Sequence, residues 1–235
     1  MNILLIGDSL LIAETQTALN QLPPGSNIAV NHLATNHFDL IIDTDFDLIP
    51  ETNCADRLAT YATLTQTVVM VGAVRRSLSE AVYILGEENM NCCLAGFNNW
   101  PTFINRPLWE VSLWMPQKNR EIAAAIFQKL GMNWREVNDR VGLVTPRIVG
   151  MIINEACYTL QEGTATIADI DRAMQLGVNY PDGPFSWANK IGLSNVYQTL
   201  AAVYNDTHDE RYKICPLLKT HFLQHKNFSM NRIEF

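Results

Sequence analysis

The sequence predicts an α/β protein in which a parallel-sheet domain, residues 1–141, is followed by an all-helical domain, residues 142–235. In the first domain, short apolar runs alternate with stretches of helical periodicity, the pattern of a parallel sheet with crossover helices. In the second domain only the helical periodicity continues. With 235 residues, 48% of them hydrophobic, the chain is long enough to bury one large core or two modest ones.

The sheet domain is expected to begin with a buried strand, because "NILLIG" at residues 2–7 is apolar and is stopped by glycine. A helix over 9–22, "SLLIAETQTALNQL", follows and is ended by "PPG" at 23–25. Further elements of this domain are expected as buried strands over 27–33, 38–43 and 67–74, a helix over 55–64 and a strand over 109–115.

The most strongly amphipathic helix of the sheet domain is "QKNREIAAAIFQKLG", residues 117–131. Gly131 is well placed as its C-terminal cap, and a last strand is expected within residues 133–139. The apolar residues that share one face of this helix, and are therefore expected in the core, are Ile122, Ala123, Ile126, Phe127 and Leu130.

The helical domain is expected to be built around a buried central helix, since the chain is apolar on nearly every face from Ile148 to Ala156 and is stopped by Gly163. The next helix has Thr166 as N-cap, with Asp169 three residues on, and is expected to end at Gly177. Ser194 is predicted to cap a later helix.

Charge and composition limit the classes of function. A net charge of −7 disfavours binding to nucleic acid, which relies on clustered Lys and Arg. We expect no membrane span, because no apolar run reaches about 18 residues. The N-terminus lacks the basic region and the cleavage site of a signal peptide, so a cytoplasmic location is expected.

No metal site is predicted. The five cysteines include no CxxC pair, and adjacent Cys92 and Cys93 should point to opposite faces of a strand. His221 and His225 stand four apart on a predicted helix, a spacing that can chelate metal, but no third ligand accompanies them.

The turn after the first strand is the place where a Rossmann-like domain binds a dinucleotide. The full fingerprint is GxGxxG, because glycines let the pyrophosphate approach the backbone and the helix N-terminus. Here Gly7 is present, but Ser9 and Ile12 stand at the second and third glycine positions. The acidic residue expected about 20 residues on, which would hold a ribose, is replaced by Asn31 and His32.

Two interpretations of this turn stay open. A dinucleotide binds weakly there, or the chain keeps a shortened Rossmann-like strand and turn for structure alone. The side chain at position 9 and the charge of Asp8 favour the second. The residues that would bind the cofactor are Gly7, Asp8 and Ser9.

A series of motifs marks the second domain. They are Glu155–Ala156, "EG" at 162–163, "DIDRAM" at 169–174, "LG" at 176–177 and "YPDGPF" at 180–185. In order and spacing this stretch resembles the C-terminal helical domain of the 3-hydroxyacyl-CoA dehydrogenase family. The first domain is similar to that family's NAD-binding domain in shortened form only. The resemblance implies NAD as cofactor and a homodimer formed through the helical domain.

The resemblance also implies a catalytic pair. In this family a His–Glu pair takes the hydroxyl proton while hydride passes to NAD. "AGFNNWPTFINRPLWEV" at 95–111 aligns without gaps with the family's pattern, which puts the carboxylate at Glu110 and the His position at Asn98. An amide cannot act as a base near neutral pH. Arg76 and Pro146 likewise stand where the family has a serine and an asparagine, so we interpret the chain as a member with weak or lost hydride transfer.

Each of these residues also has a structural interpretation. Glu110 is either a remnant of the active site or a carboxylate at the rim of the sheet, and Asn98 either hydrogen-bonds a substrate or belongs to a loop. Arg75 and Arg76, with Ser77, follow an apolar strand at the sheet edge where ligands bind, so they are the predicted substrate-binding residues for a carboxylate or phosphate. The alternative is a pair that is solvated or bridged to nearby acids.

Three hypotheses about function follow. The first is an NAD-linked enzyme of fatty-acid metabolism that acts on a 3-hydroxyacyl-CoA or a similar hydroxy acid, with weakened chemistry. The second is a non-catalytic relative that binds an acyl-CoA or small acid, or regulates as part of a complex. The third is an enzyme of another class that anchors an anionic substrate on Arg75 and Arg76.

Overall fold

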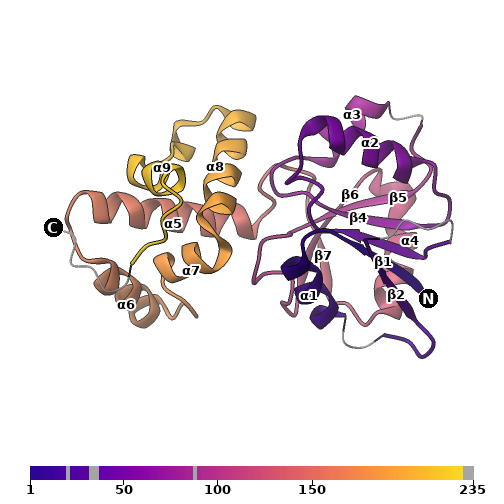
Figure 1. The fold of residues 1–235 in the computed structure, drawn as a ribbon, viewed down its shortest axis with the longest axis horizontal. Helices are drawn as coiled ribbons and strands as arrows, with labels where there is room; N and C mark the ends of the chain where they lie inside the picture. Colours follow the sequence, from indigo (N-terminus) through magenta and orange to yellow (C-terminus); the bar gives the residue numbers. More distant parts are fainter. Residues whose placement is uncertain (20–21, 32–36, 87–88, 230–235) are drawn as a thin grey trace. The chain divides into compact units, whose positions relative to one another are not determined.

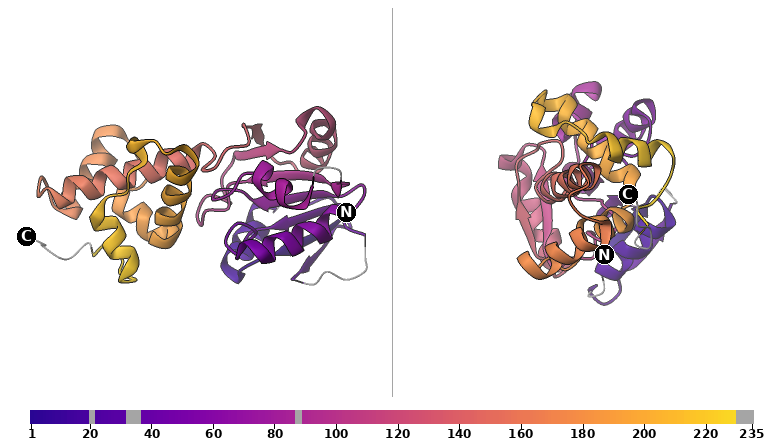
Figure 2. Two further views of the ribbon diagram at one scale, coloured as in Figure 1. Left: turned by 90° about the horizontal axis from the view of Figure 1, so that it is seen from above. Right: turned by 90° about the vertical axis from the view of Figure 1, so that its left-hand side faces the viewer.

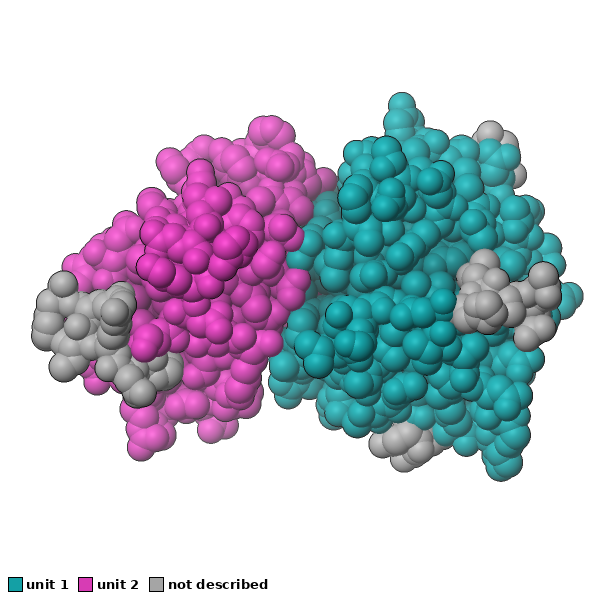
Figure 3. All heavy atoms as spheres, viewed as in Figure 1, with its two compact units in different colours: residues 1–143 teal, residues 144–235 magenta. Residues whose placement is uncertain are grey.

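The computed structural model describes residues 1–19, 22–31, 37–86 and 89–229. The chain divides into two compact units, Met1–Leu143 and Val144–Phe235, drawn in teal and magenta in Figure 3. His32 and the C-terminal residues 230–235 lie outside the described residues.

Unit 1 contains a seven-stranded sheet with the strand order β2-β1-β3-β4-β5-β6-β7 (Figure 1). Neighbouring strands are parallel except for β5 and β6, which are antiparallel. The strands are β1 Asn2–Ile6, β2 Asn27–Val30, β3 Leu40–Asp43, β4 Val68–Gly72, β5 Cys93–Phe97, β6 Trp109–Leu113 and β7 Trp134–Glu136. The predicted α/β class with a shortened Rossmann-like sheet is confirmed.

Helices cover both faces of this sheet, as the views in Figures 1 and 2 show. The helices α1 (Ser9–Ala18) and α4 (Pro116–Lys129) pack on one face. The helices α2 (Glu51–Ala62) and α3 (Leu78–Leu85) pack on the other. Cys93 belongs to the first of these two cores and Cys92 to the second, so the prediction that they point to opposite faces is confirmed.

Unit 2 is helical. Its central helix α5, Thr145–Gln161, packs against all the other α-helices of the unit. Thr166 caps the second helix as predicted, because its hydroxyl accepts a hydrogen bond from the Asp169 amide at 3.2 Å. The remaining elements are α6 Ile167–Val178, α7 Pro184–Ile191, α8 Leu193–Thr207, a 3-10 turn at Glu210–Tyr212 and α9 Pro216–Leu223.

Several expectations about burial are wrong. The strand β2 was expected to be buried, yet it forms the edge of the sheet and its residues are exposed or half-buried. Ile122 is 45% exposed, because it lies at the margin of the apolar face of α4 while Ala123 and Phe127 are fully buried. Ile148 of α5 is 56% exposed, so this central helix keeps one apolar side open in the single chain.

Three helix ends also differ from the predicted positions. The helix α6 runs to Val178, and Asn179, in the left-handed conformation, caps it in place of Gly177. The helix α8 begins at Leu193 directly after Gly192, so Ser194 lies inside its first turn and does not cap it. The helix α9 ends at Leu223, which leaves His225 beyond the helix and removes the predicted chelating geometry.

Candidate functional site

The turn after β1 packs tightly against the residue that follows β3. Gly7 has a φ of +139°, and a Cβ at this position would collide with the hydroxyl of Thr44, which follows β3. The Thr44 hydroxyl donates a hydrogen bond to the Ile6 carbonyl at 3.1 Å. Since β1 and β3 are the neighbouring strands where the strand order reverses, this contact lies at the crevice in which such sheets usually hold a ligand. A pocket of about 370 Å³ opens beside it and is lined by Ile6, Gly7, Asn31, Asp45 and Arg57.

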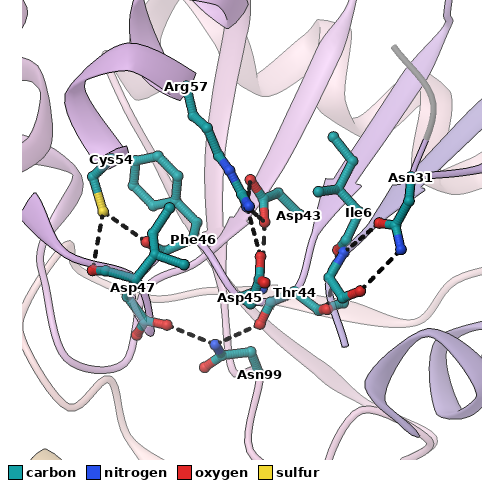
Figure 4. A network of polar contacts seen from close by, with 12 residues as sticks. Ile6, Asn31, Asp43, Thr44, Asp45, Phe46, Asp47, Cys54, Arg57 and Asn99 are labelled. Atoms are coloured by element: carbon teal, nitrogen blue, oxygen red, sulfur yellow. Dashed lines mark hydrogen bonds and ion pairs between the residues drawn. The ribbon is translucent and has the colours of Figure 1, made fainter. Parts of the chain in front are cut away.

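Asn31, at the end of β2, binds the same turn from the other side (Figure 4). The Gly7 amide donates to Asn31 Oδ1 at 2.9 Å, and Asn31 Nδ2 donates to the Gly7 carbonyl at 3.2 Å. A side chain at this position would have to reach a ribose hydroxyl if the turn held a dinucleotide. In this chain it is committed to Gly7 instead.

The N-terminus of α1 carries its own anion. Asp8 is the N-cap of the helix, and its carboxylate accepts a hydrogen bond from the Leu10 amide at 2.8 Å, while Ser9 is the first helical residue. A pyrophosphate placed at this helix end would meet the negative charge of Asp8. Taken with the contacts at Gly7, the residues present do not fit the pyrophosphate and ribose of a dinucleotide.

A buried carboxylate ties the ends of three strands together. Asp47, in the loop after β3, is 6% exposed, and its Oδ2 accepts hydrogen bonds from the Val74 and Arg75 amides, each at 2.7 Å. Its Oδ1 accepts from Asn99 Nδ2 at 2.6 Å, and the same Asn99 group donates to the Thr44 carbonyl at 2.8 Å. Figure 4 shows Asp47 and Asn99 meeting at the carboxyl edge of the sheet.

A second carboxylate, Asp43, lies inside the end of β3 and is fully buried. Arg57 Nη1 donates to both of its oxygens at 3.1 Å and to Asp45 Oδ1 at 2.6 Å, and the Tyr61 hydroxyl donates to Asp43 Oδ2 at 2.7 Å. Burial, followed by the contact with Asp45, raises the pKa of Asp43 to about 7, although Tyr61 and Arg57 act in the opposite direction. Asp43 therefore titrates near neutral pH.

The predicted catalytic residues lie at one end of the β5–β6 strand pair. Phe97, the last residue of β5, pairs with Val111 of β6; Asn98 follows Phe97 and Glu110 precedes Val111. Asn98 is 8% exposed, and its Oδ1 accepts a hydrogen bond from the Trp100 amide at 3.1 Å. Glu110 is half-buried. An amide and a carboxylate thus stand at the same end of this strand pair, at the positions where the resemblance implies His and Glu.

The predicted substrate-binding residues follow β4 directly. The side chain of Arg76 is only 15% exposed, and its Nε lies 3.9 Å from Glu80 Oε1. Arg75 is half-buried; burial lowers the pKa of its guanidinium, while the charge of Asp47 opposes that shift. Ser77 is the N-cap of α3, where its hydroxyl accepts from the Glu80 amide at 3.1 Å. Both arginines are held within the fold, and Ser77 has a structural role.

Three acidic residues that organise this edge were missed by the sequence interpretation. Asp47 is one, and Asp139 is another, since its carboxylate accepts from the amides of Leu78 and Ser79 at 2.7 and 2.8 Å and so closes the N-terminus of α3. The third is Glu14. The run "DTDFD" at 43–47 directly after an apolar strand is the signal for Asp47, because polar residues at a strand's carboxyl end lie at the ligand edge of a parallel sheet.

Metal binding at the predicted histidine pair gains no support. The His221 ring stacks on Phe228, with ring centroids 4.3 Å apart, in a packing contact. Over the part of the chain that the structure describes, no three His, Cys, Asp or Glu side chains gather in a metal-binding arrangement. In the same described residues, no helix is both long and apolar enough to cross a membrane.

Comparison with known sequences matches the second unit to one protein family. Residues 142–232 match the family model described as 3-hydroxyacyl-CoA dehydrogenase, C-terminal domain. The 3-hydroxyadipyl-CoA dehydrogenase of Escherichia coli is 38% identical over 104 residues, which are 44% of this chain and 22% of that protein. The probable 3-hydroxybutyryl-CoA dehydrogenase of Bacillus subtilis is 39% identical over 95 residues, 40% of this chain and 33% of that protein. The match therefore spans a third or less of these relatives' own length.

Comparison with solved structures extends to both units. FadB2 of M. tuberculosis aligns with a TM-score of 0.77 and 15% identity, over 95% of this chain and 93% of that one. The (S)-3-hydroxybutyryl-CoA dehydrogenase of Ralstonia eutropha aligns with a TM-score of 0.73 and 18% identity, over 95% and 94% of the two chains. At such low identity these alignments establish the shared fold alone.

Proposed function

We propose that the chain, whose C-terminal unit matches the 3-hydroxyacyl-CoA dehydrogenase family, keeps that family's scaffold without NAD-linked hydride transfer. The observation that carries this proposal is an asparagine, Asn98, directly after the last paired residue of β5, where the family resemblance implies the catalytic His. Oxidation of a hydroxyl group needs a base for its proton as the hydride leaves. An amide has no such basicity, and a carboxylate beside it has no imidazole to orient.

The turn after β1 supports the same proposal independently. NAD is the cofactor that the family resemblance implies. However, Asn31 hydrogen-bonds to the Gly7 backbone, the Thr44 hydroxyl lies against Gly7, and Asp8 puts a negative charge at the start of α1. No step of a mechanism is therefore assigned to NAD. What the chain's own residues offer at the sheet edge is hydrogen bonding from the Asn98 amide and the field of two positive charges, Arg75 and Arg76, which the fold holds in place.

We infer that the ligand is an acyl-CoA or a small organic acid. A carbonyl group accepts hydrogen bonds of the kind that an Asn amide donates, and guanidinium groups suit carboxylates and phosphates. The five cysteines are free and buried, which suits a reducing, cytoplasmic setting. The role is that of a binding or regulatory relative, working alone or in a complex.

Thermal-shift screening tests this proposal directly, because only a ligand that binds the native state raises the melting temperature. We expect a CoA ester or a short dicarboxylate to stabilise the protein, and NAD and NADH to leave it unchanged at the same concentrations. Stabilisation by NADH, with or without the thioester, would contradict the loss of the dinucleotide site. Stabilisation by none of the thioesters or acids would remove the ligand class.

A homodimer through unit 2 is the second part of the proposal. An apolar groove of about 450 Å³ lies between α5 and α6 and is lined by residues that include Ile152, Ala156 and Met174. Ile148 and Leu176, which belong to the same two helices, are 56% and 67% exposed. An isologous contact needs projecting and receiving apolar groups, and these two helices carry both.

A further inference from the structure

Two successive backbone amides after β4 point at a single oxygen atom. The amides of Val74 and Arg75 each donate to Asp47 Oδ2 at 2.7 Å, and Asn99 Nδ2 donates to Asp47 Oδ1 at 2.6 Å. Consecutive N–H groups arranged in this way form an anion-binding concavity. Here the anion that fills it belongs to the chain itself.

The surroundings of this concavity are shaped for the carboxylate. A Cβ on Gly72 would collide with the Asn99 side chain, so the glycine makes the space in which Asp47 and Asn99 meet. Arg75 adds positive charge, since Asp47 favours the charged form of its guanidinium against the effect of burial. The carboxylate is 6% exposed, so a ligand anion cannot reach the amides while Asp47 is in place.

The position of the Asp47 contact in the sheet suggests a role in ligand binding as well as in packing. It lies at the carboxyl ends of β4 and β5, the edge where open parallel sheets receive ligands. It also lies between the loop that carries Arg75 and the loop that follows Asn98, because Asn99 is one of its three donors. An external anion would meet the same donors if Asp47 were absent.

We propose that Asp47 is an internal ligand: its carboxylate fills a small-anion site built from Val74, Arg75 and Asn99, and thereby blocks it. The site takes a single carboxylate group, so its ligand class is a small monocarboxylate such as formate or acetate. Wild-type protein does not bind these anions there. This inference does not depend on the loss of hydride transfer.

Asp47 could act only as a covalent link between loops or as the occupant of an anion site, and the two roles predict different responses to a free carboxylate. If Asp47 acts only by its covalent link to the loop after β3, a free anion cannot replace it. If its carboxylate satisfies a site that exists without it, a free carboxylate of the same size restores the lost hydrogen bonds.

The test is the melting temperature of Asp47→Ala in sodium formate and in sodium chloride at equal ionic strength. We expect Asp47→Ala to melt well below wild type in chloride, and formate to raise its melting temperature saturably by about 3 °C. Wild type and Asp47→Leu, whose side chain fills the space without accepting hydrogen bonds, should melt alike in the two salts. Equal melting of Asp47→Ala in formate and chloride would overturn the proposal.

A second, milder variant keeps the test possible if Asp47→Ala does not fold. Asp47→Ser removes the carboxylate but keeps a hydroxyl, and it should show the same formate response with smaller amplitude. If both variants fail to fold in chloride, they are refolded in formate and followed by circular dichroism. Recovery of helical signal in formate supports the proposal, and absence of recovery in both variants contradicts it.

Discussion

At one end of the β5–β6 strand pair stand an amide and a carboxylate, and the chemistry of each residue decides what this pair can do. The Asn98 side chain accepts one hydrogen bond from the Trp100 amide and retains an NH2 group that donates. It can therefore hold a carbonyl group but cannot remove a proton from an alcohol. Glu110 remains in register without the imidazole that a carboxylate would normally orient.

At Asp43, burial changes the pKa of a carboxyl group. Its carboxyl group is fully buried and shares the Arg57 guanidinium with Asp45, so the second carboxylate reduces the benefit of ionising the first. Its pKa is raised from 3.8 to about 7. A folded-state pKa above the unfolded value means that the folded protein binds the proton more tightly.

Asp43→Asn is therefore expected to remove a pH dependence of stability. In wild type the contribution of Asp43 is fully present below pH 3.8 and is lost as the pH rises through about 7. The wild-type free energy of unfolding should fall by about 1–3 kcal/mol, relative to Asp43→Asn, between about pH 5 and pH 8. Urea unfolding at both pH values measures this. Asp56→Asn, an exposed change on α2, is the control, and parallel wild-type and Asp43→Asn curves would disprove the assignment.

Among the elements, the loop between β5 and β6 is held in place by α1. Glu14, on this helix, accepts hydrogen bonds from the amides of Thr102 at 2.9 Å and Asn105 at 3.0 Å. Trp100 and Ile104 anchor the loop beneath, at 2% and 1% exposure. The loop that follows Asn98 is thus fixed by a carboxylate and two buried side chains.

Glu14→Gln should loosen this loop more than it loosens the fold. We expect a loss of about 1–2 kcal/mol in the free energy of unfolding, because one charge-assisted acceptor is replaced by a neutral one. Hydrogen exchange at the Thr102 and Asn105 amides should accelerate. Glu121→Gln, an exposed change on α4, should alter stability by no more than about 0.5 kcal/mol. Unchanged exchange at both amides in Glu14→Gln would refute the role of Glu14.

The periodicity of apolar residues predicted most helices and strands, but it could not predict how deeply each one is buried. The apolar runs predicted β1, β3 and β4, and the 3.6-residue period predicted α4 and α5. The edge position of β2 depends on strand order, which a single strand's sequence does not contain. The early start of α8 follows from Gly192, which ends α7 and directly precedes the next helix, and so leaves Ser194 one position too late.

The whole molecule consists of a helical unit that matches one family's C-terminal domain and a sheet unit in which Asn31, Thr44 and Asp47 hydrogen-bond to the loops at the carboxyl edge. The family resemblance aligned Asn98 and Glu110 with the catalytic pair without gaps, and both residues lie at the same end of the β5–β6 strand pair. It could not predict Asn31 binding Gly7, or Asp47 binding Val74, because these contacts join segments far apart in the sequence. The contacts of Asn31 and Thr44 at the β1 turn favour the proposal that this turn has a structural role.

Ile148→Asp tests the proposed dimer at the same scale. Ile148 is 56% exposed in the single chain, so the change should alter monomer stability by only about 0.5 kcal/mol. In a dimer it would bury an unpaired carboxylate and weaken association by about 100-fold. Light scattering coupled to gel filtration should give two chains for wild type and one for Ile148→Asp. Leu223→Asp, 62% exposed on α9, should remain dimeric, and a monomeric wild type would defeat the expectation.

The most direct measurement is NADH consumption with acetoacetyl-CoA at high protein concentration, for wild type and for Asn98→His, beside an active dehydrogenase of the family. We predict no consumption by wild type, because the base and the dinucleotide turn are both altered. We predict none by Asn98→His either, since the imidazole alone does not reopen the turn at Gly7. Steady turnover by wild type would contradict the central claim, and turnover gained by Asn98→His would show that the β1 turn still accepts NADH.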